Sequence, residues 1–225
     1  MSDLKLEVID ARAEPYAAVP TIMFRMRMHE TSGGTVHAVA LRAQIRVEPS
    51  RRTYDSGEEE RLYELFDVPK RWGSTCKAFL LAHTGITVTA FEGSTEFDLP
   101  MVCTYDFEVI GTKYLHNVRQ GDIPLEFQFA GSIFTKGETG FAAEPVGWNK
   151  DVSFKMPAKV WHDCMDMYFP ASGWIRLRKD VIDRLAEYKT KRTQPTWDDA
   201  LEYLLKESES KSGDSGDSGD SGAQS

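Results

Sequence analysis

Long apolar runs, paired cysteines and a leader segment are missing from this sequence. No stretch approaches the roughly 20 consecutive apolar residues of a membrane span, and the first residues, MSDLKLEVID, lack the basic and apolar regions of a signal peptide. The three cysteines, Cys76, Cys103 and Cys164, form no CxxC motif, which indicates free thiols in a reducing compartment. We therefore expect a cytoplasmic protein without membrane insertion, whose cysteines are small buried side chains.

Signatures of catalysis and of cofactor binding are also lacking. The sequence contains no GxxxxGK[ST] phosphate loop, no GxGxxG at the start of a helix and no GxSxG nucleophile elbow. Its five histidines are scattered, with neither an HxH nor an HExxH motif, and zinc-ligand spacing is absent. We therefore expect no cofactor and no metal ion, and we favour a protein that is not an enzyme.

Positive charge is in deficit, with 27 lysines and arginines against 35 aspartates and glutamates and a net charge of −8. Proteins that bind nucleic acids or anionic membranes generically are usually basic, so we expect neither as a partner. Hydrophobic residues make up 41% of the 225 residues, enough for an ordinary core in one large domain or in a domain with an appendage.

The segment from Thr21 to Pro49 alternates apolar and polar residues in two runs that flank Gly33-Gly34. A period of two is typical of strands with one buried face, and a two-residue glycine turn between them predicts a β-hairpin. The register of that hairpin makes the apolar faces of the two arms coincide, with three facing pairs: Met26 and Leu41, Phe24 and Ala43, Ile22 and Ile45.

The other face of this hairpin is basic. Its arginines form the candidate binding site: Arg25, Arg27, Arg42 and Arg46, with Arg51 and Arg52 following at its end. One interpretation is docking of an acidic partner segment, because guanidinium groups bind carboxylates in a bidentate way. The other is neutralisation by carboxylates of a neighbouring strand, for which the candidates are Asp98, Asp106 and Glu108. We favour neutralisation and keep both interpretations open.

Further strands are predicted by β-branched or alternating sequences at 85–91, 104–115 and 123–135, with weaker signals at 4–11 and 152–156. Gly131 predicts a bulge in the third of these strands. Helices are predicted at 58–66, where acidic residues begin the segment, and at 75–83. The combination predicts an α+β protein: an antiparallel β-sandwich over residues 1–156 with short inserted helices around 58–83.

The composition changes after Pro157, a residue that can begin a helix. Apolar stripes predict further helices at 180–192 and from Trp197 onward, where Thr196 and Asp199 resemble a capping box. We expect residues 157–208 to form a C-terminal helical appendage packed on the sandwich. The tail, 209–225, repeats Gly, Asp and Ser without large apolar residues, so we expect it to be disordered.

Five stretches resemble an uncharacterised bacterial protein family of unknown function: EPYAAVPTIMFRMRM, VHAVALRAQIRVEPSRRTY, GSTEFDLPMVCTYDFEV, YFPASGWIRLRKD and PTWDDALEYLL. The resemblance covers residues 3 to about 206. Members of this family are often encoded beside nickel–iron hydrogenase genes, which implies a link to hydrogenase assembly or function. The family implies no catalytic residues, and the chain lacks the CxxC ligand pairs expected of the hydrogenase subunits themselves.

Two functions remain open, beside a third possibility: an oligomeric structural protein built by strand addition, which depends on an open edge strand. The first is a non-catalytic protein-binding or scaffold module, with a hydrogenase or a maturation component as the partner that the resemblance implies. The second is an enzyme of unknown reaction with a site between the sandwich and the C-terminal helices, where the candidate groups are His162, Asp163, Cys164 and Tyr105. The lack of a catalytic motif favours the first.

Overall fold

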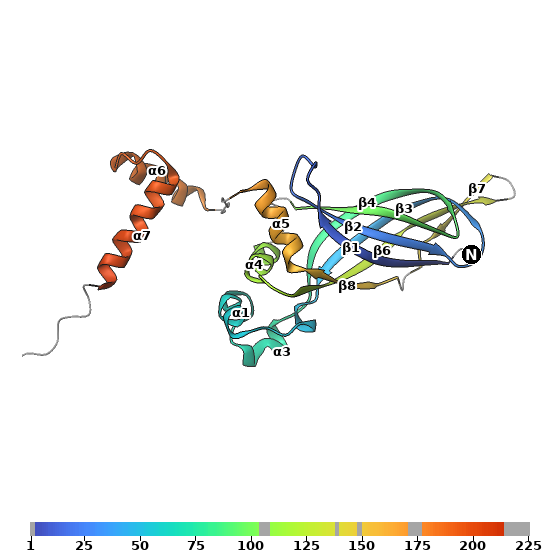
Figure 1. Cartoon of the computed structure of the whole chain (residues 1–225), viewed down its shortest axis with the longest axis horizontal. Helices are drawn as coiled ribbons and strands as arrows, with labels where there is room; N and C mark the ends of the chain where they lie inside the picture. The colour runs from blue at the N-terminus through green and yellow to red at the C-terminus, as the bar shows by residue number, and fades with distance from the viewer. Residues whose placement is uncertain (1–2, 104–108, 138–139, 148–149, 171–176, 214–225) are drawn as a thin grey trace, which may run out of the picture. The chain divides into compact units, whose positions relative to one another are not determined.

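The computed structural model describes residues 3–103, 109–137, 140–147, 150–170 and 177–213. The chain divides into two compact units, Met1–Ser172 and Gly173–Ser225. The first unit contains the strands and helices α1 to α5, and the second contains helices α6 and α7 (Figure 1).

The elements of both units follow the order of the chain. The strands are β1 Leu4–Ala13, β2 Thr21–Glu30, β3 Thr35–Val47, β4 Phe79–Glu92, β5 Ser94–Val102, β6 Asp122–Gly137, β7 Gly140–Pro145 and β8 Val152–Pro157. The α-helices are α1 Ser56–Arg61, α2 Tyr63–Phe66, α3 Trp72–Thr75, α4 Val109–Asn117, α5 Ala158–Tyr168, α6 Lys179–Lys191 and α7 Trp197–Gly213. Two short 3-10 helices are η1 Pro49–Arg51 and η2 Pro69–Arg71.

Two antiparallel sheets pack face to face in the first unit. The three-stranded sheet has the order β1-β2-β5, and the five-stranded sheet has the order β4-β3-β6-β7, with β8 also paired to β6. The inward residues of both sheets form the core, in which Phe24 of β2 and Phe127 of β6 meet edge to face with ring centroids 4.9 Å apart. The predicted α+β class and the antiparallel β-sandwich are therefore confirmed.

The predicted hairpin over Thr21–Pro49 is wrong, although its buried face is right. β2 pairs with β1 and β5, and β3 pairs with β4 and β6, so the chain crosses from one sheet to the other after Glu30. Met26 and Leu41 are both buried, but they enter the core from opposite sheets. The period-two pattern decides which face of each strand is buried, and two sheets packed face to face satisfy it as well as one hairpin does.

Two of the other predicted elements also differ. The predicted strand at 104–115 is helix α4 from Val109 onward, where Tyr114 and Leu115 are buried, and 104–108 lie outside the described residues. The predicted helix at 75–83 is mostly strand, because β4 begins at Phe79 and pairs with Val47 of β3. In both segments tertiary packing overrides local propensity. The bulge predicted at Gly131 is absent from the β3–β6 register, in which Gly131 faces Leu41 without a shift.

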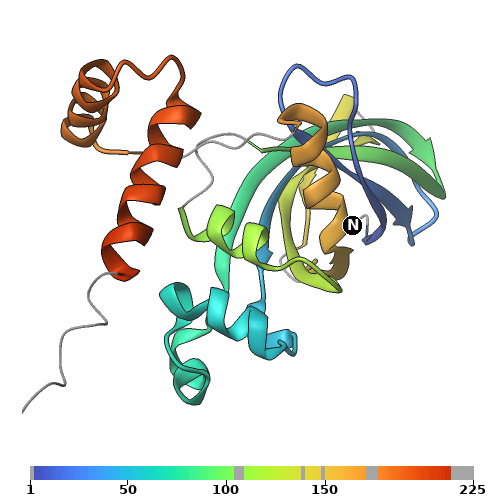
Figure 2. The same ribbon diagram turned by 60° about the vertical axis from the view of Figure 1, so that its left-hand side comes forward.

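The other predicted elements of the first unit are present. Helices α1 and α2 occupy the segment predicted at 58–66, and β1, β4, β6 and β8 include the strands predicted at 4–11, 85–91, 123–135 and 152–156. Helix α5 follows Pro157 and buries Trp161 and Cys164 against the sandwich. Helices α4 and α5 lie side by side at one end of the two sheets (Figure 2).

The C-terminal part divides differently from the expected 157–208 appendage. Helix α5 belongs to the sandwich unit, and only α6 and α7 form the second unit. The capping box is present, because the Asp199 amide donates to Thr196 Oγ1 over 3.1 Å and the Thr196 amide donates to Asp199 Oδ2 over 3.2 Å. Residues 209–213 of the predicted disordered tail continue α7, and 214–225 lie outside the described residues. The packing of this region on the sandwich stays a prediction.

Candidate functional site

The outer face of the three-stranded sheet carries a neutralised charge network. In the β2–β5 register Arg25 faces Asp98 and Arg27 faces Glu96. Arg27 Nη2 lies 2.8 Å from Glu96 Oε1, and Arg25 lies 3.2 Å from the other oxygen of Glu96 and 3.4 Å from Asp98. Arg12 of β1 completes the network, with Nη2 2.8 Å from Asp98. Two of the four predicted site arginines are therefore already bound to carboxylates.

The electrostatics of this network follow from its geometry. The Arg27 guanidinium donates to Glu96 and lowers the pKa of that carboxyl, with Arg25 adding to the effect. Arg12, followed by Arg25, likewise lowers the pKa of Asp98. Asp98 was among the carboxylates expected to neutralise the arginines, whereas Asp106 and Glu108 lie outside the described residues. Glu96 and Arg12 were missed, although Glu96 and Asp98 alternate in STEFDL as residues of one strand face do.

Arg42 and Arg46 lie on the opposite side of the sandwich, so the predicted single arginine face is wrong. They project from the outer face of the five-stranded sheet, where Arg42 faces Gly85 and Ala130, and Arg46 faces Glu126. Within the described ranges, neither arginine has a carboxylate within 4.0 Å. The error follows from the hairpin, because placing β2 and β3 in one sheet also placed all four arginines on one surface.

Small residues surround Arg42. A shallow hollow of about 350 Å³ is lined by Ala40, Leu41, Arg42, Gly85, Ile86 and Thr87. A side chain at Gly85 would be tightly placed, because its Cβ would lie 3.0 Å from the Leu41 carbonyl oxygen. The short side chains leave the sheet backbone open beside the guanidinium group, so that an extended chain could approach it closely.

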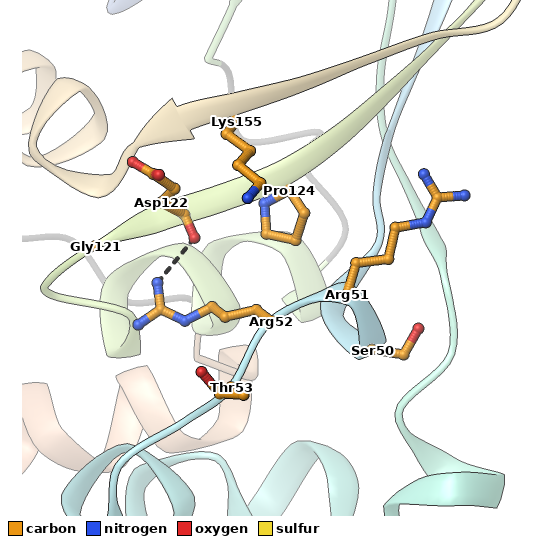
Figure 3. A pocket seen from close by; sticks show the side chains of 8 residues that line it. All are labelled: Ser50, Arg51, Arg52, Thr53, Gly121, Asp122, Pro124 and Lys155. Carbon is orange, nitrogen blue, oxygen red and sulfur yellow. Dashed lines mark hydrogen bonds between the residues drawn. The ribbon is translucent and has the colours of Figure 1, made fainter.

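A second hollow continues this face toward the end of the sheet. It measures about 510 Å³ and is lined by Ser50, Arg51, Arg52, Thr53, Gly121, Asp122, Pro124 and Lys155 (Figure 3). Lys155 of β8 faces Pro124 of β6 in the register, two residues from Glu126. Arg51 Nη2 lies 2.8 Å from Glu126 Oε2, and Nη1 donates to Ser153 Oγ over 3.2 Å. Asp122 is the acidic residue of the lining.

Arg52 in this hollow has a structural role. Its Nη1 donates to the carbonyl oxygens of Gln120, over 2.7 Å, and of Asp122, over 2.9 Å, and its Nη2 donates to Glu58 of α1. The side chain is 11% exposed, and its guanidinium carbon lies 5.3 Å from the centre of the Tyr54 ring. Arg52 therefore joins α1 to the start of β6, as Figure 3 shows for its bond to Asp122.

We define the basic face as Arg42, Arg46, Arg51 and Lys155 on the outer side of the five-stranded sheet. Glu126 is the carboxylate within this group, and it is bound by Arg51. Glu48 lies 3.9 Å from Arg51 at the edge of the face. With Asp122 in the same hollow, three carboxylates accompany the four cations of the face, and Arg42 and Arg46 are the arginines without an ion pair among the described residues. The chemistry that these two guanidinium groups offer is that of carboxylate recognition.

The groups considered for catalysis have separate partners. His162 Nε2 lies 3.0 Å from the Val118 carbonyl oxygen, and Asp163 accepts from Lys159 of the same helix over 2.5 Å. Cys164 is buried, with Sγ 3.6 Å from the Thr21 carbonyl oxygen. Tyr105 lies outside the described residues. The three described groups therefore do not converge on one point.

The described part of the chain contains no group of three or more His, Cys, Asp or Glu side chains that could hold a metal ion. Nor does any helix in it have both the length and the apolar character needed to cross a membrane.

Fold and site together define a class: a two-sheet antiparallel β-sandwich protein with a basic outer face on its larger sheet. The chain belongs to a family of unknown function, DUF6084, whose profile matches residues 1–213. This membership confirms the resemblance to an uncharacterised family, and the association with hydrogenase genes stays a prediction.

Two solved structures resemble the chain at a low level. The putative ApaA protein from Bordetella pertussis is 13% identical, over 69% of this chain and 95% of that one, with a TM-score of 0.30. A β-glucosidase from Kluyveromyces marxianus is 10% identical, over 69% of this chain and 15% of that chain, with a TM-score of 0.24. Likenesses at this level carry no argument about function. No curated protein matches the chain significantly.

Proposed function

We propose that this chain is a non-catalytic binding module whose basic face docks an acidic segment of a partner protein. The observation that carries the proposal is the contrast between the two outer faces. Arg25 and Arg27 are held by carboxylates of their own sheet, whereas Arg42 and Arg46 have no ion pair among the described residues. A guanidinium group without a protein partner keeps its fork of donors available for an incoming carboxylate.

The strand that carries these arginines supports recognition of an extended segment. β3 is paired on both sides, with β4 and β6, which fixes the positions of Arg42 and Arg46. They are four positions apart, so their Cα atoms lie roughly 13 Å apart at about 3.3 Å per residue. A partner segment with two carboxylates at a similar spacing would match both guanidinium groups.

The charge of the rest of the chain supports the same orientation. An acidic partner is repelled by a surface of net charge −8 and attracted by the basic face, so the field favours encounter at one side. Such steering acts mainly on the rate of association and on its dependence on salt.

We further propose that the partner is a nickel–iron hydrogenase subunit or a maturation component. This part of the proposal is supported by the family resemblance, and we place the interaction in the cytoplasm, where the three free cysteines would stay reduced.

Affinity capture from cells that produce the protein naturally tests both parts. The wild-type protein, the double variant Arg42→Glu/Arg46→Glu and a control are immobilised separately, and the bound proteins are identified by mass spectrometry. The control, Lys5→Glu/Lys70→Glu, changes the net charge by the same amount at exposed positions outside the basic face.

The expected result is a hydrogenase subunit or maturation protein that the wild type and the control retain and the arginine variant loses. A hydrogenase component bound equally by the arginine variant would remove the basic face from the interface. Specific retention of an unrelated acidic protein would support the face and contradict the hydrogenase link.

A further inference from the structure

The sequence itself contains a segment with the chemistry proposed for the partner of the basic face. Residues 214–225, which we call the aspartate segment, read DSGDSGDSGAQS and contain three aspartates and no lysine or arginine, a net charge of −3. They follow helix α7 directly and lie beyond residue 213, where the match to the family profile ends. An acidic chain is thus tethered to the protein that carries the basic face.

The spacing of the aspartates suits the two arginines without ion pairs. Arg42 and Arg46 have no ion pair among the described residues, and their Cα atoms lie roughly 13 Å apart on β3. Successive aspartates are three positions apart, or about 10 Å in an extended chain. Long, flexible arginine side chains cover this difference, so either Asp214 with Asp217 or Asp217 with Asp220 offers one carboxylate to each guanidinium group.

The side chains that would lie between the two partners are small. Each aspartate of the repeat is followed by Ser and Gly. The hollow of about 350 Å³ beside Arg42 includes Ala40, Gly85 and Thr87 in its lining, and Ala130 of β6 faces Arg42 from the other side of β3. The backbone of an extended segment can therefore approach the sheet closely, which brings the short aspartate side chains within reach of the guanidinium groups.

Tethering makes a weak contact sufficient. Ion pairs between exposed side chains are weak, because both charges are solvated when they are apart. A flexible Gly- and Ser-rich segment has an effective concentration on the order of mM at sites within its reach on the same chain. The aspartate segment spans up to about 40 Å when it is fully extended. It can therefore occupy a site for which the free peptide would have little affinity.

We propose that the aspartate segment binds Arg42 and Arg46 of its own chain and competes there with the acidic segment of a partner. The inference rests on the proposed function, because it requires a face that binds carboxylates. A partner must then displace the aspartate segment, so a sequence with better placed carboxylates is favoured over one that is merely acidic.

The test measures binding of a fluorescent peptide with two glutamates four residues apart to the full chain, by fluorescence anisotropy at low salt. The variant Asp214→Asn/Asp217→Asn/Asp220→Asn keeps the length of the aspartate segment and removes its charge. We expect this variant to bind the peptide about threefold more tightly than the wild type, or more, which corresponds to a face that is free in about a third of the wild-type molecules. The difference should shrink as salt rises.

A matched control removes the same charge elsewhere. Asp180→Asn/Glu187→Gln/Glu202→Gln neutralises three exposed carboxylates of α6 and α7, whose ion pairs are with exposed neighbours. This control should bind the peptide within about twofold of the wild type, because distant exposed charges are screened. An equal gain in affinity for the control and for the aspartate variant would overturn the inference, since general repulsion would then explain both.

A second measurement detects the contact without the peptide. In heteronuclear NMR spectra of the full chain, the amide signals of residues 214–222 should shift on Arg42→Gln/Arg46→Gln and stay in place on Arg25→Gln/Arg27→Gln. Shifts that persist on dilution support a contact within one chain. Shifts that vanish on dilution indicate binding between copies and would overturn the inference.

The outcomes separate this inference from the proposed function. Equal affinity of the wild type and the aspartate variant for the peptide would leave the proposed function intact and contradict the competition. A peptide that binds neither protein would contradict the proposed function, and the inference with it.

Discussion

The carboxylate of Glu30 accepts a hydrogen bond from the amide of Gly34 over 2.9 Å, which closes the turn that carries the chain from one sheet to the other. The Ser32 hydroxyl and amide donate to the same carboxylate, and Glu30 is only 2% exposed. The turn between β2 and β3, two consecutive strands that belong to different sheets, is thus organised around one buried negative charge.

Replacing this carboxylate should destabilise the fold. Glu30→Gln leaves one amide oxygen to satisfy several donors, and we expect a loss of about 1–3 kcal/mol in the free energy of unfolding at pH 7. Urea denaturation measures the loss, and Glu60→Gln, at an exposed helix position, is the control that should change little. An equal effect of both substitutions would contradict the role of Glu30.

The Glu30 carboxylate should also make the stability of the fold depend on pH. Hydrogen bonds from Ser32 and from the turn amides lower the pKa of Glu30 from 4.5 to about 2, despite burial. Because the folded-state pKa is depressed, this contribution to stability is complete above about pH 4.5 and is lost as the pH falls toward 2. The difference in unfolding free energy between the wild type and Glu30→Gln should therefore shrink over that range in urea titrations at successive pH values.

Because Arg52 is paired with buried Glu58, replacing Arg52 should destabilise the fold much more than replacing its neighbour Arg51. Arg52→Met leaves the buried Glu58 carboxylate without its partner, and we expect a loss of about 3–5 kcal/mol. Arg51→Met removes a half-exposed arginine and should cost about 1 kcal/mol or less. Chemical denaturation compares the two variants. Similar losses of unfolding free energy at both positions would contradict the role of Arg52 in joining α1 to β6.

Much of the fold was predictable because strand alternation reports burial. The inward residues Phe24, Met26 and Ile45 were identified from the sequence, and all are fully buried. Sheet membership was not predictable, because it depends on pairings with strands far away in the sequence, such as β2 with β5 and β3 with β6. A glutamate at a strand end, followed by Ser32 and two glycines, is equally compatible with an ordinary hairpin turn and with a connection between two sheets.

The candidate site shows the same limit. The arginines were identified as residue types, and their competition with carboxylates was anticipated, with Asp98 among the acceptors. Which arginines are neutralised depends on strand order: β5 lies beside β2, whereas β3 has Gly85 and Ala130 beside Arg42. Lys155 joins the basic face through the pairing of β8 with β6, a contact between distant segments that local pattern does not report.

We expect position 131, occupied by glycine, to tolerate no side chain. Its φ is +154°, and a Cβ would lie 2.0 Å from the Ala40 carbonyl oxygen of the neighbouring strand. Gly131→Ala should therefore lower the free energy of unfolding by about 1–3 kcal/mol or more. Gly73→Ala is the control, because nothing lies within 4 Å of a Cβ there. Thermal unfolding of both variants measures the difference, and a Gly131→Ala protein as stable as the wild type would contradict the close approach of β3 and β6.

The basic face makes a prediction that a defined probe can check. A fluorescent peptide with two glutamates four residues apart should bind the wild type, and its affinity should fall as salt rises, because exposed charges more than about 10 Å apart are screened at 0.1 M. Arg42→Gln/Arg46→Gln should weaken binding at least tenfold, or about 1.4 kcal/mol. Fluorescence anisotropy gives the dissociation constants.

The matched control is the pair of arginines on the other sheet. Arg25→Gln/Arg27→Gln removes two positive charges from the whole chain, yet these charges are already opposed by Glu96 and Asp98. If recognition is local to the basic face, this variant should bind the peptide within about twofold of the wild type, since distant charges act weakly through solvent. If net charge alone attracts the peptide, this control should lose affinity as Arg42→Gln/Arg46→Gln does, and docking at a defined face would be wrong.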